Sequence, residues 1–431
     1  MSSPASDSIS SADWQQRLDD IMEMMRETSR HTDPQSMVAA YARRISRMYP
    51  SNGFVAVSRR DISAPKYRVT RFSGWQETVN PWKQRDKLPV LEGGLLGELL
   101  YSGEPRIIDE LTVPDDDPSA EYLAGQRSLM AVPHLENGES LNMIFTLRAE
   151  PYAFARNDFP EIVWTSILFG RSTHNLVLAE QLRAAYNVVD RELQIVGDIQ
   201  RSLLPAELPD IPTLKLAAHY QTSQRAGGDY YDFFPLHDGR YGILIADVSG
   251  HGTPAAVMMA VTHSIAHMYP ASPGPPSDML NFVSRHLTQG YSNNVGAFVT
   301  AFYCIYDPRT RELMYSSAGH NPPRLKSCRG GGITALDGAQ KFPLGITSDV
   351  VYENASVRLQ PGDQIVFYTD GITEANDPAG NLFGIQRLDA VLSQCCGQAR
   401  DIIDAILASV AEFAAGEAAT DDRTVVVAKV E

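Results

Sequence analysis

Hydrophobic residues follow two different periods in the first part of the chain. Spacings of three and four positions predict helices, whereas short apolar runs between turn residues predict strands. The clearest turn is Asn137-Gly138, which joins the two apolar runs of residues 128–149 into a hairpin. The pattern predicts helices at 14–25, 37–48, 95–101 and from 158 onward, and strands at 53–60, 67–75, 105–109 and in the hairpin. This order predicts a small α+β domain.

A seven-residue apolar repeat fills the stretch from Asn175 to Leu204, where Gly197 is the only Gly or Pro. Because a heptad repeat makes a helix supercoil with a partner helix, the stretch predicts a homodimer. The polar Gln200 weakens this seam, and a helix that packs within its own chain is the alternative. Pro205 is expected to end the helix. The repeat comprises Leu182, Val189, Val196 and Leu203, with Tyr186, Leu193 and Gln200 between them.

After Pro212 the pattern changes to many short apolar runs interrupted by helical stretches. The expected strands are 214–223, 241–249, 297–308, 312–319, 323–328, 357–360, 363–371 and 424–430, and the expected helices are 254–269, 275–287, 387–395 and 399–415. Many antiparallel strands with helices packed outside predict a sheet sandwich flanked by helices. The whole chain is therefore divided into a disordered tail at 1–12, a domain at 13–174, a helical linker at 175–205 and a domain at 206–431.

Length and composition restrict the class of protein. The 431 residues exceed the about 250 that a single core usually reaches, and the net charge of −15 argues against nucleic acid as the main partner. The N-terminus lacks the pattern of a secretory signal, and the longest apolar stretch, 295–306, is shorter than the about 20 residues of a membrane span. The four cysteines show no CxxC spacing, which favours reduced thiols. We therefore expect a soluble, cytoplasmic protein with no nucleic-acid or membrane partner.

Aspartates stand at the ends of several apolar runs. Asp229 lies at a chain reversal, Asp247 and Asp370 each end a run, and Asp421 and Asp422 come just before the last one. Such positions bring carboxylates to one rim, where like charges cannot all stay ionised without cations. Oxygen ligands without matching Cys or His favour Mg²⁺ or Mn²⁺ over Zn²⁺. Nearby glycines are expected to allow tight turns and close backbone approach, namely Gly227, Gly228, Gly250, Gly252 and Gly371.

Six blocks, in their order and spacing, resemble the SpoIIE-type (RsbU-like) branch of the metal-dependent PPM protein phosphatases. The blocks read GGDYYDFF, DVSGHGTPAAVMMA, SAGHNPP, FPLGI, PGDQIVFYTDGITEA and DDRTVVV. The preceding helix, ELQIVGDIQRSLLP, resembles the entry segment of the family, so the whole match spans Glu192–Val430. The resemblance implies an αββα sandwich that hydrolyses phosphoserine or phosphothreonine. Its implied substrate is a phosphorylated regulatory protein of the anti-sigma-factor-antagonist type, in signal transduction such as a stress response.

The resemblance also implies roles for single residues. Asp247 would bridge two Mn²⁺ or Mg²⁺ ions, and the backbone carbonyl of Val248 would reach the first ion. Asp229 would belong to the sphere of the first ion, directly or through water. Asp370 and Asp421 would hold the second ion. Asp421 is preferred over Asp422, which aligns with a supporting Asn of the family. Water activated by the ions would attack phosphorus directly, without a Cys or Ser nucleophile; whether a third ion binds is left open.

The order of elements in residues 15–180 resembles a GAF domain, a sensory module whose members hold a small ligand or serve only to dimerise. Four aromatic residues could line a ligand pocket, although core packing is the preferred interpretation of each. They are Trp75, Trp82, Tyr101 and Trp164.

Other polar residues near the acids could have either a structural or a catalytic role. Asp232 is interpreted as a turn cap or a support for the neighbouring carboxylate. His251 is a candidate proton donor, with a loop role preferred, and His320 is expected to fix a loop against the sheet. Arg225 and Arg423 could grip phosphate, with solvated loop positions as the default.

The resulting prediction is a phosphatase regulated by its GAF-like domain, with motion passing through the linker to the helix that begins at Pro254. The alternative is a catalytically silent dimer that binds a phosphoprotein. A small-molecule phosphatase is a third interpretation.

Overall fold

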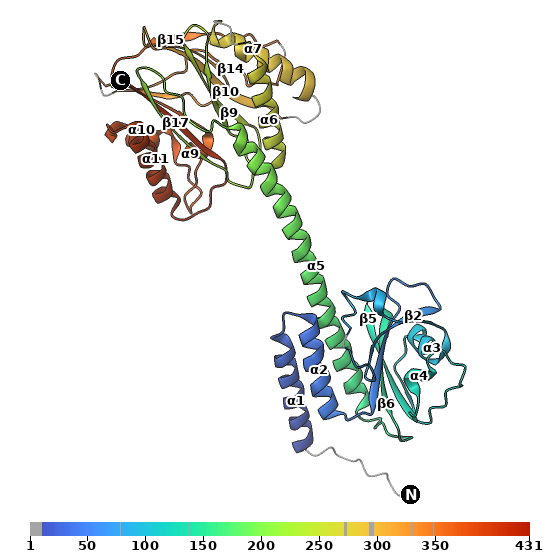
Figure 1. Ribbon diagram of the computed structural model, residues 1–431. Helices are drawn as coiled ribbons and strands as arrows, with labels where there is room; N and C mark the ends of the chain where they lie inside the picture. The colour runs from blue at the N-terminus through green and yellow to red at the C-terminus, as the bar shows by residue number, and fades with distance from the viewer. Residues whose placement is uncertain are drawn as a thin grey trace. The chain divides into compact units, whose positions relative to one another are not determined.

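The computed structural model describes residues 11–77, 79–136, 138–270, 274–292, 297–328, 330, 332–347 and 349–431. The chain forms two compact units, Met1–Tyr186 and Asn187–Glu431, and their boundary lies inside helix α5 (Phe159–Leu203) (Figure 1). Helix α1 begins at Ser11, so the tail predicted at 1–12 extends too far, and residues 1–10 lie outside the described part. None of the described helices combines the length and the apolar character that crossing a membrane requires.

The first unit is built on one antiparallel sheet of six strands in the order β3-β2-β1-β6-β5-β4. Its strands are β1 (Gly53–Ser58), β2 (Lys66–Phe72), β3 (Val90–Glu92), β4 (Arg106–Ile108), β5 (Ser128–Glu136) and β6 (Glu139–Arg148). The predicted hairpin is β5 and β6, which pair antiparallel, although Asn137 of its turn lies outside the described residues. The helices are α1 (Ser11–Ser29), α2 (Pro34–Met48), the 3₁₀ turn η1 (Arg85–Lys87), α3 (Gly94–Ser102), α4 (Ala120–Leu123) and the first part of α5.

Alternation along the strands divides the side chains of this sheet between two faces. One face packs Val55, Met143 and Phe145 against α3 and α4, whereas Met130 and Val132 on the other face pack against Ile162 of α5. The interpretation of all four aromatics as core residues is wrong for Trp82 and Trp164, which are 37% and 43% exposed.

Two cavities lie beside the sheet of the first unit. Trp82 lines a cavity of about 640 Å³ together with Arg68 and His134. Trp75 lines a second cavity of about 330 Å³, next to Tyr41 and Phe169. Two of the four aromatics therefore line pockets, and the ring of Trp82 is covered by the guanidinium of Arg71 at 5.4 Å.

The second unit is a sandwich of two sheets, as predicted. The first, called the β9 sheet, has the order β14-β11-β10-β9-β8 with β15 paired to β11, and the second, the β17 sheet, has the order β13-β12-β16-β17-β7. The strands are β7 (Leu214–Gln221), β8 (Tyr230–Pro235), β9 (Tyr241–Val248), β10 (Val299–Asp307), β11 (Glu312–Ala318), β12 (Arg324–Lys326), β13 (Ile333–Ala335), β14 (Gln340–Lys341), β15 (Ala355–Arg358), β16 (Gln364–Tyr368) and β17 (Arg423–Val430). Strand β8 was not predicted, because its sequence was interpreted as a turn.

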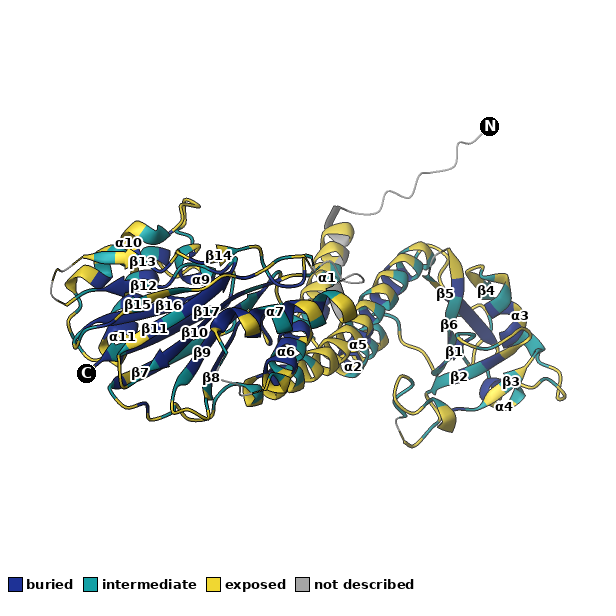
Figure 2. Cartoon of the chain, turned by 90° about the horizontal axis from the view of Figure 1, so that it is seen from above, coloured by how far each residue is buried: buried dark blue, intermediate teal, exposed yellow. Residues whose placement is uncertain are grey.

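Helices cover both outer faces of the sandwich (Figure 2). They are α6 (Thr253–Met268), α7 (Pro276–Leu287), the π turn η2 (Thr288–Ser292), α9 (Asp370–Thr373), α10 (Gly384–Gln394) and α11 (Ala399–Ala414). One apolar cluster joins α6 and α7 to the β9 sheet, and another joins α9, α10 and α11 to the β17 sheet. A third fills the space between the sheets with residues such as Phe302 and Phe367. The predicted α+β class and layered arrangement are therefore confirmed.

Candidate functional site

Strand alternation aims two of the predicted acids into the layer between the sheets. Ile243 and Ile245 belong to the core between the sheets, so Asp247, two positions further along β9, faces the same layer. Tyr231 and Phe233 of β8 also belong to that core, and Asp229 shares their parity just before the strand begins. The acids therefore lie where the inter-sheet core reaches the ends of β8 and β9.

Asp229 is held by two threonines of the opposite sheet. Its side chain is 1% exposed, and its Oδ2 accepts hydrogen bonds from Thr369 Oγ1 at 2.8 Å and from Thr424 Oγ1 at 2.6 Å. Thr369 follows β16 and Thr424 lies on β17, so these bonds tie the rim of one sheet to the other. No pattern in the sequence predicted a role for either threonine.

The two neighbouring acids before β17 have different surroundings. Asp422 is 2% exposed and accepts bonds from Ser223 N at 2.8 Å, Ser223 Oγ at 3.2 Å and Gly228 N at 2.6 Å. Its carboxylate therefore fixes the loop that leads to Asp229. Asp421 is half-buried, and its Oδ1 accepts one backbone bond, from Asp422 N at 2.8 Å.

Burial and neighbouring negative charges raise the pKa of Asp229, Asp247 and Asp370. Burial raises the pKa of Asp247 most, and the charges of Asp229, Asp370 and Asp421 raise it further. Burial likewise raises the pKa of Asp229, against the lowering effect of its threonine bonds. The pKa of Asp370 rises to about 6 through burial and then the charge of Asp421. These carboxylates, which come from separate segments, thus lie within electrostatic reach of each other.

This donor set fits hard divalent cations. It consists of carboxylate oxygens without Cys or His. Bound cations would offset the repulsion between the carboxylates, which otherwise favours their protonated forms. Within the described residues, no three of these acids have ligand oxygens that all lie within 4.8 Å of one another.

Glycines next to the acids are needed mainly for space. An ideal Cβ on Gly227 would lie 1.9 Å from Asp422 Oδ2, and one on Gly371 would lie 1.9 Å from the Asp422 carbonyl oxygen. Neither residue has a positive φ, whereas Gly250 and Gly252 in the turn after Asp247 do. The expected positive φ is therefore found at Gly250 and Gly252. Gly227 and Gly371 are glycines because Asp422 lies too close to leave room for a side chain. Val248 joins this packing, because a Cβ on Gly228 would lie 2.8 Å from its carbonyl oxygen.

The other polar candidates are engaged in separate contacts. His251 is exposed, and its Nδ1 is 2.9 Å from Gln224 Nε2. His320 is buried with Nδ1 2.9 Å from Thr300 Oγ1, and burial lowers its pKa to about 4. Arg423 donates to the Gly371 carbonyl at 3.3 Å.

Asp232 faces the outer side of the β9 sheet. It accepts hydrogen bonds from Tyr230 Oη at 2.6 Å, Phe233 N at 2.7 Å and His267 Nε2 at 2.7 Å. The expectation of a turn cap or a support for Asp229 is therefore wrong, because Asp232 connects β8 with helix α6.

The end of α5 packs directly on the loop before Asp229. Gln200 is 3% exposed, and its amide pairs with the backbone of Gly227, with Nε2 donating to the carbonyl at 2.5 Å and Oε1 accepting from N–H at 2.9 Å. Arg225 donates to both carboxylate oxygens of Asp190 at 2.9 and 3.1 Å. An ideal Cβ on Gly197 would lie 2.0 Å from the Arg225 carbonyl oxygen. Gln200 therefore binds the loop of its own chain and does not face a partner helix at this position.

Most of the second unit is similar to a known protein family. Residues 237–431 match the family described as Stage II sporulation protein E (SpoIIE). The matched SpoIIE segment contains Asp247, Asp370 and Asp421, whereas Asp229 lies just before it.

Relatives of the SpoIIE segment include two curated phosphatases of Bacillus subtilis (strain 168). The chain is 29% identical to phosphoserine phosphatase RsbU over 224 residues, which are 52% of this chain and 66% of RsbU. It is 27% identical to phosphoserine phosphatase RsbP over 186 residues, 43% of this chain and 45% of RsbP. The chain therefore spans less than two thirds of the length of either relative.

A solved structure shows the fold. The SiaA-PP2C domain of Pseudomonas aeruginosa superposes with a TM-score of 0.51 at 23% identity, covering 57% of this chain and 99% of that domain. The SpoIIE segment therefore has the PP2C fold.

The charges at the site predict how the stability of the metal-free protein depends on pH. Asp370 has an ordinary pKa of 3.8 and about 6 in the fold, so between these values the folded state binds more protons than the unfolded state. This contribution is complete below pH 4 or so and is lost as the pH rises through about 6. We expect Asp370→Asn to stabilise the metal-free protein more at pH 7 than at pH 5, measured by urea unfolding in EDTA. An equal effect at both pH values would contradict the raised pKa.

Proposed function

We propose that the second unit is a metal-dependent phosphatase that acts on phosphoserine or phosphothreonine. The observation that carries this proposal is the set of buried, mutually repelling aspartates at one end of a SpoIIE-family sandwich. The names of RsbU and RsbP support the same reaction.

In this proposal Asp229, Asp247, Asp370 and Asp421 hold two Mn²⁺ or Mg²⁺ ions, with the carbonyl of Val248 as a further ligand. When bound, such ions lower the pKa of water and neutralise phosphate oxygens. The threonine bonds of Asp229 orient its carboxylate, and the three bonds of Asp422 favour Asp421 as the ligand of the pair. Asp422 then positions the loop that precedes Asp229.

We propose a phosphorylated regulatory protein of the anti-sigma-antagonist type as the substrate. Arg225 pairs with Asp190, and Arg423 bonds a backbone carbonyl, so both arginines have other partners than phosphate. Selectivity would then come from docking of the partner protein rather than from a tight grip on phosphate. The four cysteines are free thiols, which supports a cytoplasmic location.

The test is turnover by the full chain on p-nitrophenyl phosphate, on metabolite phosphates and on phosphoserine proteins, with Mn²⁺, Mg²⁺ or EDTA. We expect metal-dependent release of phosphate, with the phosphoserine protein as the preferred substrate. Preference for metabolite phosphates would favour a small-molecule phosphatase. Binding of the phosphoprotein without any turnover would favour the catalytically silent module.

We propose that the first unit is a GAF-like sensor. Its six-stranded antiparallel sheet with helices on both faces supports this assignment. The cavity of about 640 Å³ offers a site for a small polar ligand, because its lining includes Arg68, whose buried Nε has no hydrogen-bond partner within the described residues.

Regulation would pass along α5 to the catalytic loop. The Gln200–Gly227 contact offers a shorter route to Asp229 than the predicted route through the helix at Pro254, because Gly227 lies two residues before the acid. Deletion of residues 1–186 should therefore change phosphatase activity or metal affinity. A truncated protein that matches the full chain in both would contradict this regulation.

Exposed apolar residues of α5 support a homodimer. Leu182, Tyr186 and Val189 are 60%, 68% and 53% exposed, whereas Leu193, Val196 and Leu203 further along the repeat are half-buried. The seam would therefore use the earlier half of the repeat.

We expect the double variant Leu182→Glu and Val189→Glu to shift the protein from dimer to monomer, because it places charges on the seam of the proposed supercoil. Light scattering coupled to size-exclusion chromatography measures the change. Asn187→Glu adds a charge at an exposed position on the same helix and serves as the control. A double variant that keeps the mass of the wild type would contradict the proposed dimer seam.

A further inference from the structure

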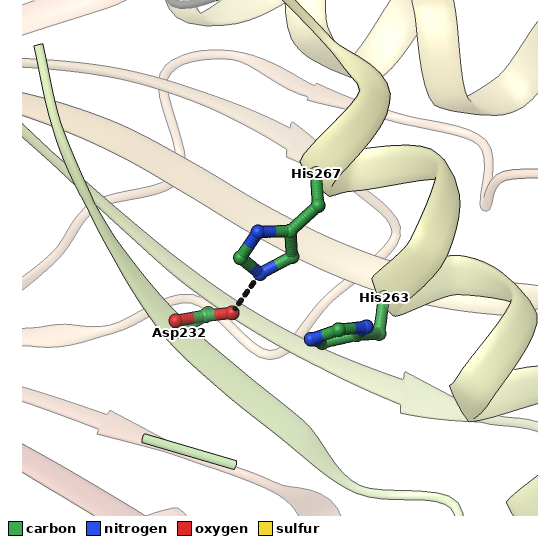
Figure 3. A group of neighbouring side chains, drawn as sticks. All are labelled: Asp232, His263 and His267. Carbon is green, nitrogen blue, oxygen red and sulfur yellow. Dashed lines mark hydrogen bonds and ion pairs between the residues drawn. The ribbon is translucent and has the colours of Figure 1, made fainter. Parts of the chain in front are cut away.

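Three ligand side chains meet between β8 and α6 (Figure 3). Asp232 comes from β8, and His263 and His267 come from consecutive turns of α6. Their ligand atoms all lie within 4.8 Å of one another, and no other three His, Cys, Asp or Glu side chains among the described residues are grouped in this way. The two imidazoles share one helix face because residues four apart are neighbours on a helix.

The group is partly organised already. Asp232 is 7% exposed, and its Oδ2 accepts from Tyr230 Oη and from His267 Nε2. The rings of His263 and His267 lie 4.3 Å apart between centroids, and that of Tyr230 lies edge-on to His263 at 5.6 Å. An Asp232–His267 ion pair explains part of this arrangement. This ion pair leaves out His263, whose buried Nδ1 has no hydrogen-bond partner among the described residues.

Two imidazoles and one carboxylate are typical ligands of borderline transition metals such as Zn²⁺, Co²⁺ and Ni²⁺, and Mg²⁺ or Mn²⁺ prefer oxygen alone. We propose that Asp232, His263 and His267 bind one ion of the Zn²⁺ class. The hydrogen bond from Tyr230 would orient the Asp232 carboxylate, as outer-sphere partners of metal ligands commonly do. The His267 side chain is 47% exposed, which gives an ion and one water molecule access.

This site is separate from the acids of the proposed phosphatase centre. Asp229 shares the inter-sheet face with Tyr231 and Phe233, whereas Asp232 has the parity of Tyr230 and lies on the helix-covered face. An ion at Asp232 would link the far end of α6 to β8. Since α6 begins at Thr253, just after the turn that follows Asp247, the ion would fix the helix next to that turn.

The test uses the full chain without a histidine tag, stripped of metal and titrated with Co²⁺ and Zn²⁺. We expect one equivalent of Co²⁺ with visible absorption bands of a low-coordinate site, retained in Asp247→Asn. His263→Gln and His267→Gln should each lower the affinity for Zn²⁺ by about 100-fold or more, since even outer-sphere changes cost 10–100-fold. His237→Gln, at an exposed histidine between β8 and β9, is the matched control and should bind as the wild type does.

A measurement without substitutions guards against variants that fail to fold. X-ray absorption at the zinc edge of the wild-type protein with one equivalent of Zn²⁺ should show two imidazole ligands. Oxygen ligands alone, loss of the Co²⁺ bands in Asp247→Asn, or unchanged Zn²⁺ affinity in both folded histidine variants would each overturn the proposal. Because the readouts are binding and spectroscopy, a protein without phosphatase turnover can still pass or fail this test.

Discussion

Asp247→Asn is expected to lower metal-dependent turnover by about 1,000-fold, on the scale seen when one group that stabilises a transition state is removed. Asp247 faces the layer between the sheets and interacts electrostatically with Asp229, Asp370 and Asp421, so it is the acid best placed to serve two ions. Asn keeps the shape but lacks the negative charge that a divalent ion needs. Initial rates on p-nitrophenyl phosphate across a Mn²⁺ titration measure the effect.

The Asp247 prediction needs a control that changes charge alone. Asp210→Asn removes a carboxylate that is 96% exposed, and it should leave the rate within about twofold of the wild type. The variant Asp247→Asn should also fold, because it removes a buried group whose charged form is disfavoured. Full activity in a folded Asp247→Asn protein would refute the proposed metal site.

Gly197→Val is expected to lower turnover by about 100-fold, the scale of a misplacement by 1 Å. A side chain at Gly197 would collide with the Arg225 carbonyl, where even a Cβ would come within 2.0 Å. Backbone cannot move aside as a flexible side chain can, so α5 must separate from the loop. The bonds between Gln200 and Gly227 would then break, and Asp229 would lose the support of that loop.

Ile195→Val, on an exposed position of the same helix, is the control for Gly197→Val. Both proteins should be compared by circular dichroism and by rates on p-nitrophenyl phosphate at saturating Mn²⁺. If Gly197→Val folds and keeps the rate of Ile195→Val, the contact between α5 and the loop does not control the acids.

Local signals in the sequence were sufficient for most of the longer helices and strands and for the position of the acids at strand ends. Short continuous apolar runs predicted β9, β16 and β17, and the acids were recognised because they stand at the ends of these runs. Strand β8 was not predicted because its segment, GGDYYDFF, begins with two glycines and contains Asp229 and Asp232, and these residue types are common in turns. Its residues are strand because they pair with β9 over Tyr230–Pro235.

Residues that act through distant partners could not be found in this way. Thr424 bonds Asp229 across 195 positions of sequence, and no local pattern marks such a pair. Gln200 was interpreted by its heptad position, although its partner is the backbone of Gly227. The spacing of His263 and His267 was visible in the sequence, but their neighbour Asp232 became evident only from the packing of α6 on β8.

Strand β17 lies between β16 and β7 in the interior of its sheet, although it is the last strand of the sandwich in sequence order. Both Asp421 and Thr424 therefore leave the ribosome only after nearly all of the sandwich has been synthesised. Until then Asp229 lacks Thr424, and β16 and β7 have no strand between them. A nascent chain would therefore lack the proposed phosphatase activity until β17 has been synthesised and has paired with β16 and β7.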